Sequence, residues 1–485
     1  MFRFKNHKND SFFNDIYGKK LDKYQRKAVL NDNRELLVVA GAGSGKTLTI
    51  VAKAKYLIEK QEIRPEEILC LSFTNEAVNN LKEKIKYPVR VLTFHKLALE
   101  ILQDNCFNYQ ISSDTLINYT VNEFFLMNND INQKMIMEYF DNTNYFDILN
   151  SKELLILKNN LMSFIKTIKC NNVSVNRIKK IRSYCLNSKD KIFFFLALKI
   201  FDLYENELFS EYKIDFDDMI TYAKYLVEKH GLKKYYQYII IDEYQDISKI
   251  RFDLIMAIKN YLGCNLMCVG DDYQAIYGFS GSSVSLFLDF FKYFPNADRV
   301  DIKNTYRNSY ELIHTSLKFI KKNPRQLRKN IHATFLYKNP IVLVYYEDYL
   351  KTYNNLFDYL YLENERKVLV LARYNKDLDE IKEIEHSGIA TRYLTVHMSK
   401  GLEEEVVVLV KFSNDYLGFP SKIVDNKLIS YIKNNEEDIL YAEERRLFYV
   451  ALTRCRKRIY ILVPKNNPSI FLKEIKSEAC ELLFE

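Results

Sequence analysis

Short runs of apolar, β-branched residues recur along the chain, and a segment with helical periodicity follows each run. Because the runs lack polar alternation, they predict strands buried on both faces, and their alternation with helices predicts parallel sheets of the doubly wound kind. The runs form two groups, so we expect an α/β protein with two such lobes. The predicted strands are 36–39, 68–71, 89–92, 238–241 and 266–269 in the first group, and 341–345, 368–371, 406–410 and 459–463 in the second.

The 485 residues suffice for two or three domains, each with its own core. Between residues 97 and 205 the pattern changes to long segments of helical periodicity without a strand-like run, which predicts a helical insertion in the first lobe. We therefore expect four segments: residues 1–97 and 206–298 form the first lobe, 98–205 the insertion, and 299–485 the second lobe.

The charge balance is compatible with a polyanionic partner. The formal net charge is +8, and residues 151–190 hold nine basic side chains against two acidic ones. A second basic cluster follows the second lobe's first helical segment. Each cluster is either a solvated face or a surface that faces phosphates, and the sequence leaves both readings open. The second cluster consists of Lys318, Lys321, Lys322, Arg325, Arg328 and Lys329.

The cysteines and the N-terminal residues indicate a cytoplasmic protein. The eight cysteines are scattered, and the nearest pair, Cys264 and Cys268, falls within an apolar run, which favours reduced thiols over disulfides or a zinc site. The first residues contain no apolar segment of the kind found in secretory leaders, and no apolar stretch reaches membrane-spanning length. We expect no membrane partner.

A loop of small residues follows the first predicted strand and precedes a helical segment. Small residues let backbone N–H groups wrap phosphates, and the helix start adds positive potential. Lys46 is expected to contact the β- and γ-phosphate oxygens, and Thr47 to offer its hydroxyl to Mg²⁺. The loop alone predicts only a nucleoside triphosphatase. It consists of Ala40, Gly41, Ala42, Gly43, Ser44, Gly45, Lys46 and Thr47.

Polar side chains end two other strands of the first group. Adjacent carboxylates at a buried strand end, here Asp242 and Glu243, are costly unless a cation such as Mg²⁺ lies there. We expect Asp242 to hold the metal through its hydration shell and Glu243 to accept a proton from the attacking water. The alternative is an exposed acidic turn. Gln274 follows the next strand and is expected near the γ-phosphate, with Tyr277 and Phe279 directed toward bases.

With these residues in place, the chain resembles superfamily 1 helicases of the UvrD/Rep/PcrA type, and the matches keep the family's order through both lobes. In the first lobe, residues 22–25 resemble the adenine-reading Q motif, 72–75 and 93–95 two motifs that touch single-stranded DNA, and 215–219 another short family motif. In the second lobe, residues 304–307, 395–403 and 444–454 resemble motifs IV, V and VI.

The resemblance implies ATP as the nucleotide, two RecA-like lobes and a helical 1B insertion. Gln25 would hydrogen-bond the adenine edge, Tyr306 would stack on the ring, and Glu403 would contact the ribose. Arg307 and Arg454 would sense the γ-phosphate and stabilise the charge of the transition state.

On the DNA side, the resemblance implies stacking by Phe73, Tyr277 and Phe279, with His95 and His397 near backbone or bases. Thr74, Asn75 and Thr93 belong to the same DNA-contacting motifs.

The chain departs from the family pattern in several places. Leu48 stands where the family has an arginine after the loop threonine, which puts base selectivity in question. Phe279 and Ser280 replace a Trp-Arg pair, and Glu404 replaces a phenylalanine. The largest departure is the short distance between residues 371–375 and motif V, which leaves no room for the family's mobile 2B subdomain.

We therefore expect an ATP- and Mg²⁺-dependent 3′ to 5′ DNA helicase or translocase that engages single-stranded DNA or a duplex with a 3′ overhang. The alternative is a DNA-stimulated ATPase switch that controls a partner, such as a nuclease in DNA repair or anti-phage defence. A small-molecule P-loop kinase is disfavoured because the second lobe carries its own arginine motifs.

Overall fold

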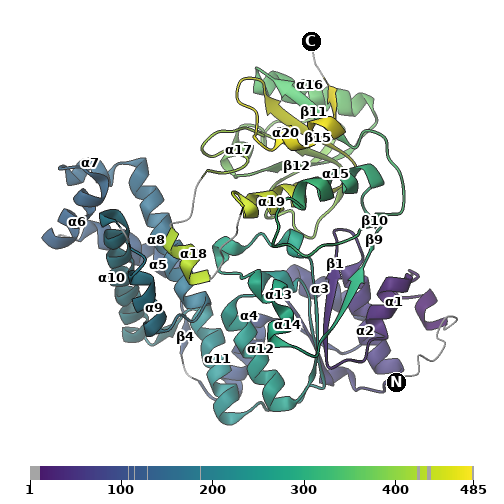
Figure 1. Ribbon diagram of the computed structural model, residues 1–485, viewed down its shortest axis with the longest axis horizontal. Coiled ribbons are helices and arrows are strands. Elements are labelled where there is room, and N and C mark those ends of the chain that lie inside the picture. The colour runs from purple at the N-terminus through teal and green to yellow at the C-terminus, as the bar shows by residue number, and fades with distance from the viewer. Residues whose placement is uncertain are drawn as a thin grey trace.

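The computed structural model describes residues 11–482 apart from 108, 114, 128, 186, 423–426 and 434–438. The residues before position 11, on which the expectation about a leader rests, lie outside this range. Figure 1 shows two α/β lobes, one above the other, and a helical domain beside them at the left. The fold class predicted from the apolar runs is confirmed.

The first lobe is built on a six-stranded sheet in which every pairing is parallel. Its central strands are buried on both faces, as their continuous apolar sequence requires. The strand order is β3 (Arg90–Thr93), β2 (Ile68–Ser72), β6 (Tyr238–Ile241), β7 (Asn265–Gly270), β1 (Glu35–Ala40) and β8 (Asp298–Ile302).

Two hydrophobic cores cover the two faces of this sheet. Alternate residues of β1 enter different cores, because successive side chains of a strand point to opposite faces. One core includes side chains from α1 (Lys23–Val29), α2 (Lys46–Glu59) and α3 (Asn75–Ile85), and the other from α4 (Phe94–Asp104), α11 (Phe216–His230) and α12 (Lys249–Leu262).

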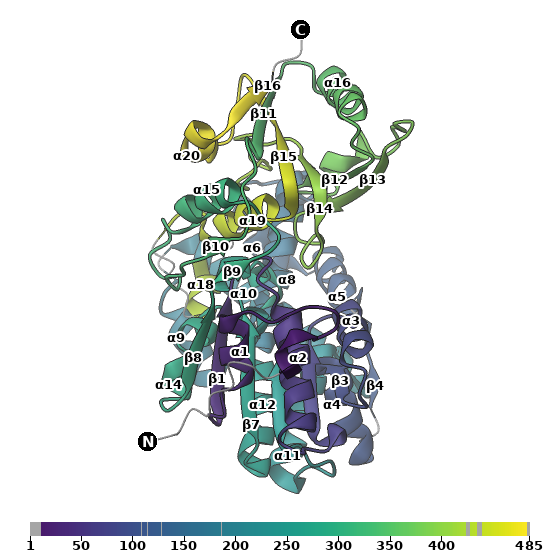
Figure 2. The ribbon, with the colours of Figure 1, turned by 90° about the vertical axis from the view of Figure 1, so that its right-hand side faces the viewer.

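The second lobe repeats this design. Figure 2 shows its sheet above that of the first lobe, and all its pairings are parallel. The order is β13 (Ala390–Thr395), β12 (Lys367–Ala372), β14 (Glu404–Leu409), β15 (Cys455–Pro464), β11 (Ile341–Tyr346) and β16 (Cys480–Leu482). Its two cores include α15 (Tyr310–Ile320), α19 (Ala442–Leu452) and α20 (Leu472–Ile475) on one face, and α16 (Tyr349–Leu362) and α17 (Lys376–Asp379) on the other.

The helical domain has a core of its own, and a short helix of the second lobe completes it. Leu428, Ile429 and Ile432 of α18 (Lys427–Lys433) are buried in this core. The ring of Tyr431 stacks on Tyr184 with centroids 4.4 Å apart. In Figure 1 α18 stands out by its yellow-green colour among blue helices. The domain's other helices are α5 (Thr115–Leu126), α6 (Asp130–Phe140), α7 (Tyr145–Leu149), α8 (Lys152–Cys170), α9 (Val175–Arg182) and α10 (Ser188–Ser210).

The structure places three predicted boundaries differently. Helix α10 continues the helical domain to Ser210, past the predicted end of the insertion at residue 205. Helix α4 begins the segment assigned to the insertion, yet its apolar side chains lie in the core of the first lobe. Residues 299–302 belong to β8, which pairs with β1, so they lie in the first sheet rather than in the second lobe. In each case the packing partner, which local sequence does not reveal, decides the assignment.

The second lobe runs from β12 through α17 directly into β13, with no further domain between them. None of the described helices is long and apolar enough to cross a membrane. All eight cysteines are free thiols. Among the described residues no His, Cys, Asp and Glu side chains gather into a cluster that could by itself hold a metal ion.

Candidate functional site

A cavity of about 910 Å³ lies between the two lobes, at the carboxyl ends of the strands of the first sheet. The first lobe contributes most of the loop between β1 and α2, and the second lobe contributes residues that follow β9 (Asn304–Thr305), β13 and α19. Most of the predicted nucleotide-site residues line it. They are Gln25, Gly41, Gly43, Ser44, Gly45, Lys46, Thr47, Glu243, Gln274, Tyr306, Arg307, Glu403 and Arg454.

Three predicted residues do not line the cavity. Ala40 is the last residue of β1 and is fully buried, and Ala42 is 1% exposed. Asp242 is 6% exposed, at the end of β6.

The loop before α2 has the geometry of a phosphate cradle. Gly43 and Gly45 adopt φ values of +68° and +80°, which side-chain-bearing residues rarely adopt. The helix begins at Lys46, so the amide groups of its first turn have no acceptor within the helix. The buried hydroxyl of Ser44 also has no partner among the described residues. These free donors around a lysine fit a bound triphosphate.

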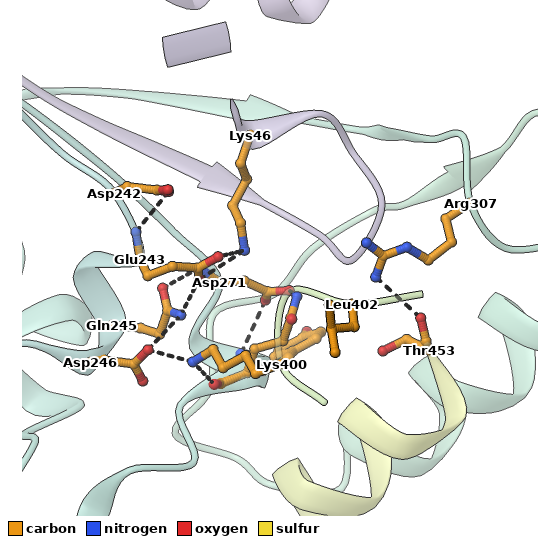
Figure 3. Close-up of polar contacts among 12 residues, drawn as sticks. Lys46, Asp242, Glu243, Gln245, Asp246, Asp271, Arg307, Lys400, Leu402 and Thr453 are labelled. Carbon is orange, nitrogen blue, oxygen red and sulfur yellow. Dashed lines mark hydrogen bonds and ion pairs between the residues drawn. The ribbon is translucent and has the colours of Figure 1, made fainter. Parts of the chain in front are cut away.

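Glu243 lies at the focus of two cations. Its carboxylate pairs with Lys46 at 3.0 Å and accepts a hydrogen bond from Gln245 Nε2 at 2.6 Å (Figure 3). Burial would raise the pKa of Glu243, but the ammonium groups of Lys46 and Lys400 hold it below its ordinary value. Its backbone is left-handed, with φ of +50°, a strained state that is common at functional sites.

Asp242, its neighbour, has the opposite electrostatics. Burial, and next the charge of Glu243, raise the pKa of Asp242 to about 7. A carboxylate that is costly to ionise gains most from a nearby divalent cation. The pair, together with the Thr47 hydroxyl on the cavity wall, therefore fits Mg²⁺ that arrives with a nucleotide.

Arg454 reaches from the second lobe into the first. Its Nη2 donates to Gln274 Oε1 at 3.0 Å, and its other donors bind carbonyl oxygens of Val450 at 3.0 Å and Leu402 at 3.1 Å. Burial, and next the charge of Arg307, lower the pKa of Arg454 to about 9, so it stays charged at neutral pH. Gln274 thus joins the two lobes at the cavity.

Arg307 lies on the side of the phosphate loop opposite to Asp242 and Glu243 (Figure 3). Its guanidinium pairs with Glu403 and donates to the carbonyl of Thr453 at 3.4 Å. The backbone beside it contacts the loop directly, because Tyr306 N donates to Gly43 O at 3.0 Å. A Cβ on Gly43 would lie 2.3 Å from the Arg307 Cβ, so only glycine permits this approach.

The predicted adenine-binding residues are linked across the lobes. Asp22 caps α1 and accepts hydrogen bonds from the Tyr306 hydroxyl at 2.8 Å and Asn304 Nδ2 at 2.9 Å. Gln25 is buried, donates to Ser44 O at 3.1 Å, and closes the capping box with Asp22. The ring of Tyr306 is half exposed at the cavity, open to a stacking partner.

Three rings from both lobes form a cluster beside the cavity. Phe279 lies 5.3 Å from His397 and 6.1 Å from Tyr277, and the Tyr277 hydroxyl donates to His397 O at 3.2 Å. Burial, and next Arg373 and Lys400, lower the pKa of His397 to about 3, which keeps the ring neutral. Phe279 remains 50% exposed, so the cluster offers an apolar face to a ligand.

The remaining predicted DNA contacts lie at the carboxyl ends of β2 and β3 in the first sheet. Phe73 is half-buried against Phe94, and the ring of His95 lies 5.3 Å from that of Phe216. Burial and the nearby Arg251 lower the pKa of His95 to about 4. Thr74 and Thr93 cap α3 and α4 with their hydroxyls, so each also has a structural task. Asn75 is exposed at the start of α3.

Lys400 is a site residue to which the sequence assigned no task. Its Nζ pairs with Asp246 of the first lobe and donates to Gln274 O at 2.7 Å (Figure 3). Its position inside the motif V match was the one available indication. It adds a second bridge between the lobes.

The basic clusters contain two buried lysines, which neither interpretation of those clusters anticipated. Lys169 is 7% exposed and pairs with Glu205, Asp215 and Asp218, where the helical domain meets α11. Lys329 is 4% exposed and pairs with carboxylates of the first lobe. For these two, both the solvated and the phosphate-facing interpretations are wrong, because neighbouring carboxylates neutralise them.

Comparison with known proteins covers almost the whole chain. Residues 21–295 match the UvrD/REP helicase N-terminal domain, and residues 190–466 match the UvrD-like helicase C-terminal domain. DNA helicase IV of Escherichia coli (strain K12) is 31% identical, over 96% of this chain and 71% of that protein.

Other relatives are similar over a smaller share of their length. The putative ATP-dependent DNA helicase YjcD of Bacillus subtilis (strain 168) is 30% identical over 64% of this chain, which spans 39% of that protein. ATP-dependent DNA helicase Rep of Buchnera aphidicola is 26% identical over 79% of this chain, which spans 55% of that protein. With both lobes matched in order, the chain belongs to the UvrD/Rep helicase family.

Proposed function

We propose that this protein is an ATP-driven motor that moves 3′ to 5′ on single-stranded DNA. The observation that carries the proposal is the shared cavity, in which Lys46 and Glu243 of one lobe face Arg307 and Arg454 of the other. Such a site is complete only when the lobes meet, so nucleotide turnover and lobe movement are linked. The direction of movement is supported by the family resemblance.

The residues divide the chemistry of hydrolysis among them. Lys46 exchanges Glu243 for phosphate oxygens when a triphosphate enters, which frees the Glu243 carboxylate to accept a proton from water. Mg²⁺, held near Asp242 and Thr47, would neutralise charge on the β- and γ-oxygens. Arg307 and Arg454 stabilise the charge that spreads over the transferred group, and Gln274 holds Arg454 in place.

The ring cluster of Tyr277, Phe279 and His397 supplies the proposed DNA contact. Aromatic faces stack on bases with little sequence preference, as a motor requires. Because two rings belong to one lobe and His397 to the other, opening and closing of the cleft would change the surface offered to a base. Phe73, Asn75 and His95 would contact the part of the DNA strand that passes over the first lobe.

A second function is favoured by the direct passage from β12 through α17 to β13. This passage leaves out the additional domain with which larger relatives engage duplex DNA, as the resemblance implies. A DNA-stimulated ATPase switch that acts with a nuclease or a repair factor is therefore the alternative.

The rate of ATP hydrolysis with and without single-stranded DNA tests the proposal. Stimulation by DNA is expected, and Lys46→Ala should abolish turnover while the circular dichroism spectrum is unchanged. Unstimulated turnover would contradict both the motor and the switch. Single-stranded RNA of the same sequence serves as the comparison that separates a DNA motor from an RNA motor.

Strand displacement then separates the motor from the switch. A duplex with a 3′ overhang should be unwound and one with a 5′ overhang should not. ATP hydrolysis without displacement of either duplex would favour the switch, and displacement from the 5′ overhang would contradict the proposed direction.

A further inference from the structure

Lys329 occupies an unusual place for a residue of a basic cluster. It lies after α15 in the second lobe's part of the chain, and its side chain is 4% exposed. Its ammonium pairs with Asp271 and, at 2.5 Å, with Asp272, both fully buried in the first lobe, and lies 4.0 Å from the centre of the Tyr273 ring. A buried cation surrounded in this way is costly to lose, because two adjacent carboxylates would be left without it.

The residues next to Lys329 fasten the same segment to the first lobe. Leu327 N donates to Asp272 Oδ2 at 2.8 Å, and the Tyr273 hydroxyl donates to Leu327 O at 2.8 Å. A Cβ on Gly41 would lie 2.4 Å from Ile331 Cδ1, so the segment packs tightly on the phosphate loop. Residues 327–331 therefore lie between the phosphate loop and the turn that carries Gln274.

A chain of contacts leads from Lys329 to the cavity. Asp271 accepts a hydrogen bond from Gln274 Nε2 at 2.5 Å, and Gln274 Oε1 accepts one from Arg454 Nη2 at 3.0 Å. An ionised Asp271 can only accept, so it takes the amide nitrogen of Gln274 and leaves the amide oxygen toward the arginine. The Lys329 ammonium pairs with this same carboxylate of Asp271 and so holds it in place beside Gln274.

We infer that Lys329 is a positioning residue for ATP hydrolysis: through Asp271 it fixes the orientation of Gln274, and thereby holds Arg454 at the nucleotide cavity. The inference rests on the proposed function and names a residue outside the motifs that the family resemblance supplies. Lys329 is not among the residues that line the cavity, so we expect it to act through its neighbours.

The test compares Lys329→Met with Lys321→Met, an exposed lysine of the same basic cluster. In Lys329→Met the kcat for DNA-stimulated ATP hydrolysis should fall about 10²-fold, as displaced catalytic groups do, while KM for ATP changes little. Lys321→Met should retain the kcat of the unmodified protein. An unchanged kcat in Lys329→Met would overturn the inference.

A double-mutant cycle separates positioning from general support of the fold. If Lys329 acts through Gln274, adding Lys329→Met to Gln274→Ala should lower kcat no further. Multiplied losses in the double variant would overturn the relay.

If Lys329→Met does not fold, the isosteric change Asp271→Asn replaces it. It interrupts the same relay and should lower kcat without raising KM, and full turnover in that variant would overturn the inference. Absence of hydrolysis in the unmodified protein would instead overturn the proposed function and this role with it, which distinguishes the two failures.

Discussion

Glu243 combines a strained backbone with a carboxylate that pairs with Lys46 and is also influenced by the charge of Lys400. Residues other than glycine rarely adopt a left-handed φ, so contacts with neighbouring residues hold Glu243 in this conformation. Its low pKa means that the carboxylate is ionised at neutral pH, and the departure of Lys46 to a bound triphosphate would make it a stronger base. This makes Glu243 the most informative single position in the cavity.

We expect Glu243→Gln to bind ATP but to hydrolyse it about 10²- to 10⁴-fold more slowly, because the amide cannot accept the proton of the attacking water. Single-turnover hydrolysis and a nucleotide-binding assay measure the two effects. Glu66→Gln, an exposed change in the same lobe, is the control. A rate equal to that of the unmodified protein would remove Glu243 as the base.

His397 predicts how stability depends on pH. Its pKa is about 3 in the folded protein and about 6.5 in an unfolded chain, so below pH 6.5 only the unfolded state gains the proton. Stability from this site is present above pH 6.5 and is lost as the pH falls toward 3, by about 1.4 kcal/mol per pH unit.

Urea unfolding at several pH values between 6.5 and 4 checks this. His397→Asn should show a shallower decline of the unfolding free energy than the unmodified protein. His314→Asn, a change at an exposed histidine of α15, is the control. Parallel declines in all three proteins would show that His397 is not held neutral.

The phosphate loop and the carboxylates after β6 could be predicted from local sequence, whereas Gln25, Tyr306, Arg307, Glu403 and Arg454 were expected at the cavity only from the family resemblance. A glycine-rich loop before a helix predicts phosphate binding, and two carboxylates after a buried strand predict metal binding, from the local sequence alone. Lys329 and Lys169 could not be predicted, because a lysine in a basic run looks solvated until its carboxylate partners from other elements are known. Lys400 lies between these cases.

At the scale of elements, each apolar run named from the sequence overlaps a strand of the structure. Within the two six-stranded sheets, the strands that the sequence did not reveal are β8, β13 and β16, and all three lie at sheet ends. An end strand is covered on fewer sides, so it carries polar residues and loses the continuous apolar pattern, as the partly exposed residues of β8 show. Whether a strand lies at the end of a sheet depends on the tertiary fold, so the local sequence does not reveal it.

Gly43 of the phosphate loop can be compared with Gly18, a glycine of similar backbone conformation outside the loop. Gly43 and Gly18 have φ of +68° and +71°, but a Cβ at Gly43 meets Arg307 and Thr305 whereas one at Gly18 meets nothing within 4 Å. Gly18→Ala should cost only the backbone strain, about 1 kcal/mol. Gly43→Ala should in addition push the lobes apart.

Kinetics and thermal unfolding distinguish the two variants. We expect Gly43→Ala to lose about 10²-fold in kcat, because displacement of Arg307 misaligns the catalytic groups. Gly18→Ala should keep its kcat and lose only a few degrees in Tm. Equal kcat values in the two variants would contradict the close approach of Arg307 to the loop.

At the scale of the whole molecule, α18 joins the second lobe to the helical domain. The stacked pair Tyr184 and Tyr431 and the buried Leu428, Ile429 and Ile432 make this contact. Arg177 adds a hydrogen bond to the carbonyl of Tyr431.

Tyr184→Ala should loosen α18 by about 1 kcal/mol, the usual contribution of an aromatic pair. Hydrogen exchange followed by mass spectrometry should then show faster exchange in residues 427–433 and unchanged exchange in both sheets. Tyr119→Ala, an exposed change on α5 of the same domain, should leave α18 as protected as before. Equal protection of α18 in both variants would mean that the stack does not hold it.

Besides the first lobe, the second lobe contacts the helical domain, through α18. The first lobe leads into the helical domain and back, and then into the second lobe, which returns to the helical domain before α19 and Arg454. Because each of the two lobes and the helical domain contacts the other two, we expect that no two of them can rotate against each other without moving the third. We therefore expect a force on the helical domain to reach, through α18, the lobe that carries Arg454, so that such a load would change the rate of ATP hydrolysis.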